Sequence, residues 1–336
     1  MDAKRLLGCI PGAIQAAKAK DAGQLSDMEQ VAMLAAPWDN SEQPSIISWD
    51  DKWRAHLQEL ADAYDILRDY GKMPAVWDIA RYFGYDLEEL CGTRQKTNDC
   101  TAWGVSRAST CLALQQRWIG AEIHADKLNP SGNYAYSSEM PPRANMRVPD
   151  NGRTIYAAAK AACVFGNYTV DDIGEYTGKA MYTPAMLKTQ PDAQRRQTGW
   201  VYLGDGYNAQ ELADIILLSL RAGRPAIIGN TVALQDGVAI TSDLVCVSYV
   251  GGSWGGGHCT AAVDVKKIGS NYYIWIYNSH GNLYPAGNGA PAAGTYITYD
   301  GLIKYLSGSY ADVMLTTYTE SPRYHNNNLN PEASRA

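Results

Sequence analysis

The sequence lacks the patterns that mark membrane proteins, metal-binding modules and disulfide frameworks. No stretch approaches the roughly 20 consecutive apolar residues that a membrane-spanning helix needs. The seven cysteines are an odd set without a Cys-x-x-Cys pair, and no two histidines stand at helical spacing. We therefore expect mostly free thiols and no metal or other cofactor. Residues 1–8 hold too short an apolar run for a secretory signal, which predicts synthesis in the cytoplasm.

An excess of basic residues is also missing. The formal net charge is -6 at pH 7, which argues against a general surface for nucleic acid. With 336 residues and 46% hydrophobic content, the chain is long enough to bury a full core. The composition therefore predicts a globular protein whose partners are neither nucleic acids nor membranes.

What the sequence does contain is an ordered set of three chemically related residues: Cys100, then His258, then Asn278. A thiolate is the reactive form of cysteine, and a nearby imidazole can hold it as an ion pair. An amide on the other ring nitrogen can fix the tautomer and direction of that imidazole. Each residue type thus has a separate task in nucleophilic attack by a thiol.

The local patterns place these residues on secondary structure. After Cys100, apolar positions recur at steps of three and four as far as Trp118, which predicts a helix whose unpaired N–H groups lower the thiol pKa. The glycine-rich turn 251–257 leads to His258 at the start of a buried strand. The run 272–277 is aromatic and β-branched and predicts a second strand, with Asn278 as its exit residue.

These motifs resemble those of the papain-like cysteine peptidases. The likeness lies in Gln95 before the nucleophile, Cys-Thr-Ala-Trp-Gly at 100–104, the apolar strand at His258, and Asn-Ser-His-Gly at 278–281, and it extends over roughly residues 90 to 320. The closing strand and turn at 296–302 resemble those of the bacterial and viral branch. The resemblance implies an α+β, two-lobed fold: a helical lobe, an antiparallel β-barrel lobe, and here an N-terminal helical extension.

The resemblance also assigns tasks within a peptidase that cleaves polypeptides. Gln95 and the backbone N–H of Cys100 would stabilise the oxyanion. Asn151 and Gly152 resemble the family's glycine-rich turn and would pair with the substrate backbone.

Four departures from the family pattern bear on catalysis. Gln95 stands five positions before Cys100, where six is usual, and Thr101 stands where a tryptophan is usual. Asp99 precedes the nucleophile and would raise the thiol pKa unless it points into solvent. His280 replaces the tryptophan that shields the asparagine–histidine hydrogen bond, which predicts a wetter site.

The chain divides by pattern into four parts. Residues 1–90 are helix-rich, with one helix entered at 48–50 and ended by Gly71. The helical lobe spans 91–200, the β-barrel lobe spans 201–320, and a polar tail follows at 321–336.

The N-terminal part has three candidate meanings: a cleaved pro-segment, although the family's usual motif is not visible, a docking module for a larger assembly, or a nucleic-acid reader. The third rests on residues 77–90, whose sequence pattern resembles a helix-turn-helix motif but lacks a basic face.

Two functions from different classes follow. The first is a cysteine peptidase or amidohydrolase that uses Cys100, His258 and Asn278. The second is a catalytically weak or inactive papain-like interaction protein, such as a bacteriophage virion component, that joins a particle through residues 1–90 and the C-terminal tail. Asp99 and His280 favour the second.

Overall fold

The computed structural model describes the following parts of the chain. The described residues are 46–87, 94–95, 99–119, 154–165, 199–238, 247–284 and 290–317. Among them, no helix is long and apolar enough to cross a membrane.

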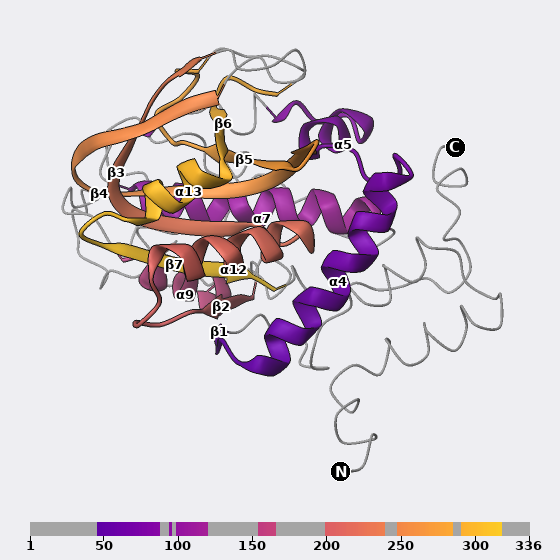
Figure 1. Cartoon of the computed structure of the whole chain (residues 1–336), viewed down its shortest axis with the longest axis horizontal. Coiled ribbons are helices and arrows are strands. Elements are labelled where there is room, and N and C mark those ends of the chain that lie inside the picture. Colours follow the sequence, from indigo (N-terminus) through magenta and orange to yellow (C-terminus); the bar gives the residue numbers. More distant parts are fainter. Residues whose placement is uncertain are drawn as a thin grey trace, which may run out of the picture.

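Among the described residues, seven strands form one mixed sheet (Figure 1). The pairings of β1 with β2 and of β4 with β6 are parallel, and the others are antiparallel. β6 lies at one edge of the sheet and also pairs with the beginning of β4, where Val247 is opposite Tyr296. The long β4 therefore curls until its first residues meet this edge. In spatial order the strands are β1 (Ile46–Ser48), β2 (Trp200–Tyr202), β7 (Ala311–Thr316), β3 (Ala226–Val238), β4 (Val247–Ile268), β5 (Asn271–Tyr277) and β6 (Gly294–Thr298).

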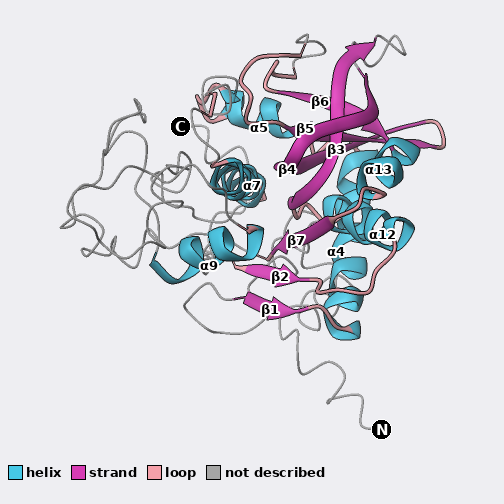
Figure 2. Cartoon of the chain, turned by 90° about the vertical axis from the view of Figure 1, so that its left-hand side faces the viewer, coloured by secondary structure: helices cyan, strands magenta, loops and turns pink. Residues whose placement is uncertain are grey.

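Helices cover both faces of this sheet, as Figure 2 shows edge-on. One face, here called the α7 face, carries α5 (Val76–Tyr82), α7 (Cys100–Trp118) and α9 (Ile155–Phe165). The other, the α12 face, carries α4 (Asp51–Asp69), α12 (Ala209–Arg221) and α13 (Tyr299–Leu306).

Alternation along the strands supplies each face with its own core. On β4, Ala261 and Val263 belong to the core of the α7 face, whereas Ala262 belongs to that of the α12 face. All three side chains are fully buried. The apolar run at 261–263 is thus a strand buried on both sides, as its sequence predicts.

The predicted helix after Cys100 is confirmed as α7, which begins at Cys100 itself. The helix predicted between 48–50 and Gly71 is confirmed as α4. The Asp50 side chain accepts the backbone N–H of Trp53 at 2.8 Å and so caps the first turn. Gly71, with φ of 66°, follows the end of α4 in a left-handed conformation that side chains rarely adopt.

Two local predictions are wrong. The glycine-rich stretch 251–257 is not a turn but part of β4, so His258 lies within a strand rather than at its start. Gly252 and Gly255, with φ of 74° and 78°, allow the bulges by which β4 stays paired with β3 despite its register shifts. The turn expected after β6 is the helix α13, whose first turn is capped by the Thr298 hydroxyl.

The α+β class is confirmed, whereas the division into two lobes and the four sequence boundaries stay predictions. Residues 46–87, which fall in the predicted N-terminal extension, supply β1 to the sheet and α4 and α5 to the two cores. Residues 321–336 lie outside the described residues.

Candidate active site

His258 and Asn278, 20 residues apart in the chain, lie side by side. Their contact joins His258 Nε2 and Asn278 Oδ1 at 2.9 Å, and both side chains are buried. β4 carries the histidine, and the asparagine is the first residue after β5. The strands bring the two together because Ala261 of β4 pairs with Tyr277, the last residue of β5. Their adjacency was expected from the sequence.

Cys100 lies at the start of α7, against β4. The pairing of β4 with β5 begins at Ala261. The backbone of β4 just before this point, at Cys259, is therefore open to the start of α7. The N–H of Cys259 interacts with the Cys100 sulfur, which therefore lies beside the residue that follows His258. Among the described residues, no hydrogen bond joins this sulfur to the His258 imidazole, so direct thiol–imidazole contact stays a prediction.

The pKa of the Cys100 thiol is raised, contrary to the sequence-based expectation. Burial is the largest cause, because it disfavours the thiolate, and the Asp99 carboxylate adds to it. The backbone N–H groups of Cys259, Thr101 and Cys100 itself act in the opposite direction. The helix start thus favours the anion, as expected, but burial outweighs that effect.

Asp99 does not point into solvent. Its side chain is fully buried, and its Oδ2 accepts the indole N–H of Trp103 at 3.0 Å, one helical turn further on. The carboxylate is therefore fixed beside Cys100. The departure noted in the sequence has the consequence predicted for it, namely a less acidic thiol.

Two aromatic rings pack around the His258 imidazole. The ring centroids of Trp254 and His280 lie 4.7 Å and 4.5 Å from that of His258, and the two rings are 5.4 Å from each other. His258 is 7% exposed, so the expectation of a wetter site is not met. Trp254, from the glycine-rich part of β4, shields the imidazole together with His280. The sequence did not predict this shielding by Trp254.

The same enclosure keeps His258 neutral. Its pKa is lowered to about 4, first by burial and also by His280, although the hydrogen bond to Asn278 acts to raise it. A neutral imidazole can accept a proton, which is the state that a general base requires.

Gln95 is anchored to Ser279, the residue after Asn278. Its backbone N–H donates to the carbonyl of Ser279 at 2.8 Å, and its side-chain Oε1 accepts from the Ser279 hydroxyl. The hydroxyl contact fixes the oxygen of the amide. Its predicted task at the oxyanion stays a prediction.

The two predicted substrate-binding residues, Asn151 and Gly152, lie outside the described residues. Within the part of the chain that the structure describes, no group of three or more His, Cys, Asp or Glu residues is arranged to hold a metal ion.

Two residues at the site were not singled out from the sequence. Trp254 lies over His258, and the Tyr284 hydroxyl accepts the Asn278 Nδ2–H at 3.0 Å. The sequence offered one signal for each: Trp254 is an aromatic residue within a run of glycines, and Tyr284 is an aromatic residue six positions after Asn278.

A pocket of about 390 Å³ adjoins the cover of His258, because Trp254 and His280 belong to its wall. Apolar side chains contribute much of the remaining lining, and Leu283 among them is 53% exposed. The other lining residues are Leu234, Gln235 and Tyr284.

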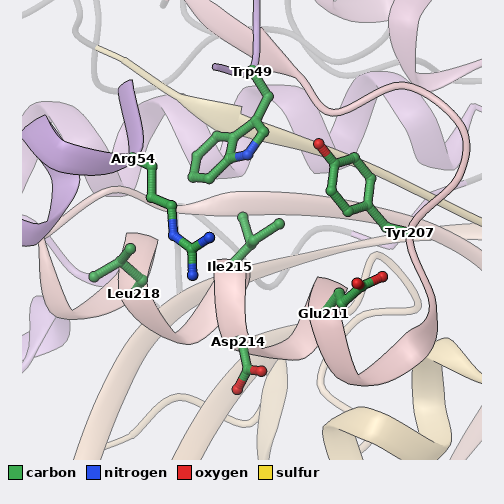
Figure 3. Close-up of a pocket in the computed structure, with 7 residues that line it drawn as sticks. All are labelled: Trp49, Arg54, Tyr207, Glu211, Asp214, Ile215 and Leu218. Atoms are coloured by element: carbon green, nitrogen blue, oxygen red, sulfur yellow. The ribbon is translucent and has the colours of Figure 1, made fainter. Parts of the chain in front are cut away.

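A second pocket, of about 140 Å³, offers no comparable chemistry (Figure 3). Its carboxylates already have structural tasks: Glu211 accepts the backbone N–H of Asn208 at the start of α12, and Asp214 accepts the Tyr299 hydroxyl. The pocket is lined by Trp49, Arg54, Tyr207, Glu211, Asp214, Ile215 and Leu218.

Comparison with known proteins identifies similar structures but no matching family model and no matching curated protein. Xylellain, a cysteine protease from Xylella fastidiosa, has a TM-score of 0.40 at 17% identity, over 67% of this chain and 81% of that one. A cysteine protease of Carica candamarcensis has a TM-score of 0.40 at 15% identity, over 70% and 97%. Procathepsin B from Trypanosoma congolense has a TM-score of 0.40 at 10% identity, over 88% and 90%. These solved structures are cysteine proteases, but scores and identities this low carry no argument about function.

Proposed function

We propose that this protein is a cysteine peptidase or amidohydrolase of the papain-like type, with Cys100 as nucleophile and a polypeptide as substrate. The single observation that carries the proposal is the buried contact between His258 Nε2 and Asn278 Oδ1 at 2.9 Å, on the strand segment whose backbone also touches the Cys100 sulfur. In this proposal, three groups that are far apart in sequence act together at the start of α7.

The contact with Asn278 assigns a separate task to each nitrogen of the imidazole. Asn278 Oδ1 can only accept a hydrogen bond, so it favours the tautomer that carries a proton on His258 Nε2. Nδ1 is then the nitrogen with a lone pair for the thiol proton. In the first step that proton moves to Nδ1, and the sulfur of Cys100 bonds to the substrate carbonyl carbon.

The remaining steps complete the hydrolysis. The negative charge that develops on the carbonyl oxygen is stabilised by the Cys100 backbone N–H and the Gln95 amide. His258 gives its Nδ1 proton to the leaving nitrogen as the C–N bond breaks, which leaves a thioester on Cys100. A water molecule then loses a proton to His258 and attacks the thioester, which releases a carboxylic acid and restores the thiol.

The enclosure of the site suits this cycle. A neutral thiol and a neutral imidazole form the resting state, because burial raises the pKa of Cys100 and lowers that of His258 to about 4. Proton transfer then accompanies attack instead of preceding it. The pocket beside Trp254 and His280 lies on the imidazole side, where the leaving half of a peptide would be placed.

Labelling with a peptidyl chloromethyl ketone tests the proposal. Mass spectrometry of the wild-type protein should find the label on the peptide that contains Cys100, and His258→Ala should slow labelling at least about 100-fold. Cys163→Ala, which removes a buried thiol on α9, is the matched control and should label like the wild type. The peptidase proposal would be refuted if His258→Ala were labelled as fast as the wild type, or if Cys100 were not labelled at all.

One observation favours a second function. The buried Asp99 carboxylate helps to raise the pKa of Cys100, as expected of a chain that keeps the fold for binding rather than turnover. In that case the protein is an interaction component of a virus particle, docked through residues 1–90 and 321–336. No labelling of Cys100, together with recovery of the intact chain in purified phage particles, would support this second function.

A further inference from the structure

The amide of Asn278 makes two hydrogen bonds in opposite directions. Its Oδ1 contacts His258 Nε2 at 2.9 Å, and its Nδ2 donates to the hydroxyl oxygen of Tyr284 at 3.0 Å. Both bonds are buried: Asn278 is fully buried, His258 is 7% exposed and Tyr284 is 5% exposed. The catalytic amide is therefore held from both ends.

From this arrangement we infer that Tyr284 is a positioning residue for the catalytic imidazole, acting through Asn278. The inference rests on the proposed function, since it concerns the same site. Tyr284 meets the site through the hydrogen bond that its hydroxyl accepts from Asn278 Nδ2. Its effect on His258 is transmitted by the orientation of one amide group.

The chemistry of the two protonation states explains why this second bond matters. When His258 takes the thiol proton, both ring nitrogens carry a hydrogen, and Nε2–H then needs an acceptor. Asn278 provides one only while its oxygen faces the ring, which points its NH₂ group away from the ring. Tyr284 accepts a hydrogen bond from that NH₂ group, so the amide can face the imidazole without a buried donor left unpaired.

The position of Tyr284 is itself well supported. Its backbone N–H donates to the carbonyl of Ala292 at 3.1 Å, and the backbone N–H of Asn278 donates to the carbonyl of Ala293 at 3.0 Å. Adjacent carbonyls of one segment therefore hold both partners. Tyr284 also belongs to the core of the α12 face, so its ring has a fixed place from which to bind the amide.

Tyr284→Phe removes the acceptor and keeps the ring. We expect kcat to fall about tenfold with KM unchanged, because the Nδ2 donor of Asn278 loses its buried partner and the amide turns away from His258. Tyr284→Trp should have a similar effect, because an indole offers a donor but no acceptor. The matched control is Tyr64→Phe, which removes another buried hydroxyl in the core of the α12 face, on the helix α4.

A double-mutant cycle separates positioning from general damage. In an Asn278→Ala background the amide is gone, so adding Tyr284→Phe should change kcat less than about twofold. If Tyr284 merely supported the fold, the second substitution would lower kcat about tenfold in both backgrounds. Equal losses in the two backgrounds would overturn the inference.

A measurement independent of turnover covers the case in which the protein is not a peptidase. In the wild type, proton NMR should detect the His258 Nε2–H as a downfield, slowly exchanging signal, because it is buried and bonded to Asn278. Tyr284→Phe should broaden this signal or speed its exchange at least about tenfold, and Tyr64→Phe should not. An unchanged signal in Tyr284→Phe would refute the positioning role, whereas the expected change without any peptidase activity would count against the proposed function alone.

Discussion

Cys100 and Cys163 are buried cysteines on two helices of the same face of the sheet, α7 and α9, and the surroundings of their sulfurs differ. Cys100 is the first residue of α7, whereas Cys163 lies near the end of α9. Burial raises the pKa of both thiols, and for Cys100 backbone N–H groups oppose this effect, among them that of Cys259 on β4. Burial by itself therefore favours the protonated thiol, and placement at a helix start against a strand partly offsets this effect, which is where the proposed function puts the nucleophile.

The largest expected effect is the loss of function on removal of one thiol and not the other. Cys100→Ala should lower peptidase activity at least about 1,000-fold, because the attacking atom is gone. Cys163→Ala should leave kcat/KM within about twofold of the wild type. Hydrolysis of a mixture of peptides, followed by mass spectrometry, measures both, and a similar loss in the two variants would remove the distinction between the helices.

Acid should affect the site through His258 rather than through either thiol. The pKa of His258 is about 4, so the imidazole is a neutral base above that pH and becomes protonated as the pH falls through it. We expect kcat/KM to decline about tenfold for each pH unit below 4. A pH–rate profile of the folded protein measures this decline, with circular dichroism as the check on folding. An acid limb near the ordinary histidine pKa, about 6.5, would contradict the burial of this imidazole.

The close approach of α7 to β4 can be disturbed at Gly104. A Cβ added at this glycine would lie 2.7 Å from the sulfur of Cys259, so in Gly104→Ala either this buried sulfur or the helix has to shift. We expect the free energy of unfolding to fall by about 1–3 kcal/mol. Denaturation with urea measures the change, and labelling of Cys100 should slow with it.

The second substitution Cys259→Ala removes the obstructing sulfur and provides the control. The pair Gly104→Ala with Cys259→Ala should recover most of the stability lost in the single variant. Failure of this rescue would mean that the helix and the strand do not meet at these two residues.

The smallest expected effect comes from the carboxylate beside the nucleophile. Asp99→Asn keeps an acceptor for the Trp103 indole but removes the negative charge that helps to raise the pKa of Cys100. Alkylation of Cys100 by iodoacetamide at neutral pH should become about threefold faster, because a larger fraction is thiolate. Alkylation of N-acetylcysteine added to the same sample is the internal reference. An unchanged or slower rate at Cys100 would show that Asp99 does not control this thiol.

The sequence predicts the elements that carry the site because their signals are local. Apolar spacing of three and four marks α7 from its first residue, and the aromatic, β-branched run of β5 places Asn278 at its end. The neighbouring strands then bring Asn278 and His258 together as expected. Helix starts and strand ends are decided by a few adjacent residues, so one sequence suffices to find them.

The features that the sequence did not predict depend on contacts between distant segments. Trp254 covers His258 because two glycines permit β4 to bulge and continue, which a glycine-rich run does not distinguish from a turn. Tyr284 meets Asn278 through the return of the chain after β5. The direction of the Cys100 pKa shift was missed because burial, known only from the fold, outweighs the helix start.

The short strand β1 limits how this chain could be matured by proteolysis. Residues 46–48 hydrogen-bond to β2 as the outermost strand of the sheet, and α4, which follows, fills the core of the α12 face with fully buried side chains such as Leu57, Leu60 and Tyr64. A cut near residue 90 that released the preceding residues would remove these side chains from the core and leave β2 as the edge strand of the sheet. A processing enzyme that spares the fold must therefore cut upstream of Ile46, so a removable inhibitor within residues 1–90 would end before that strand.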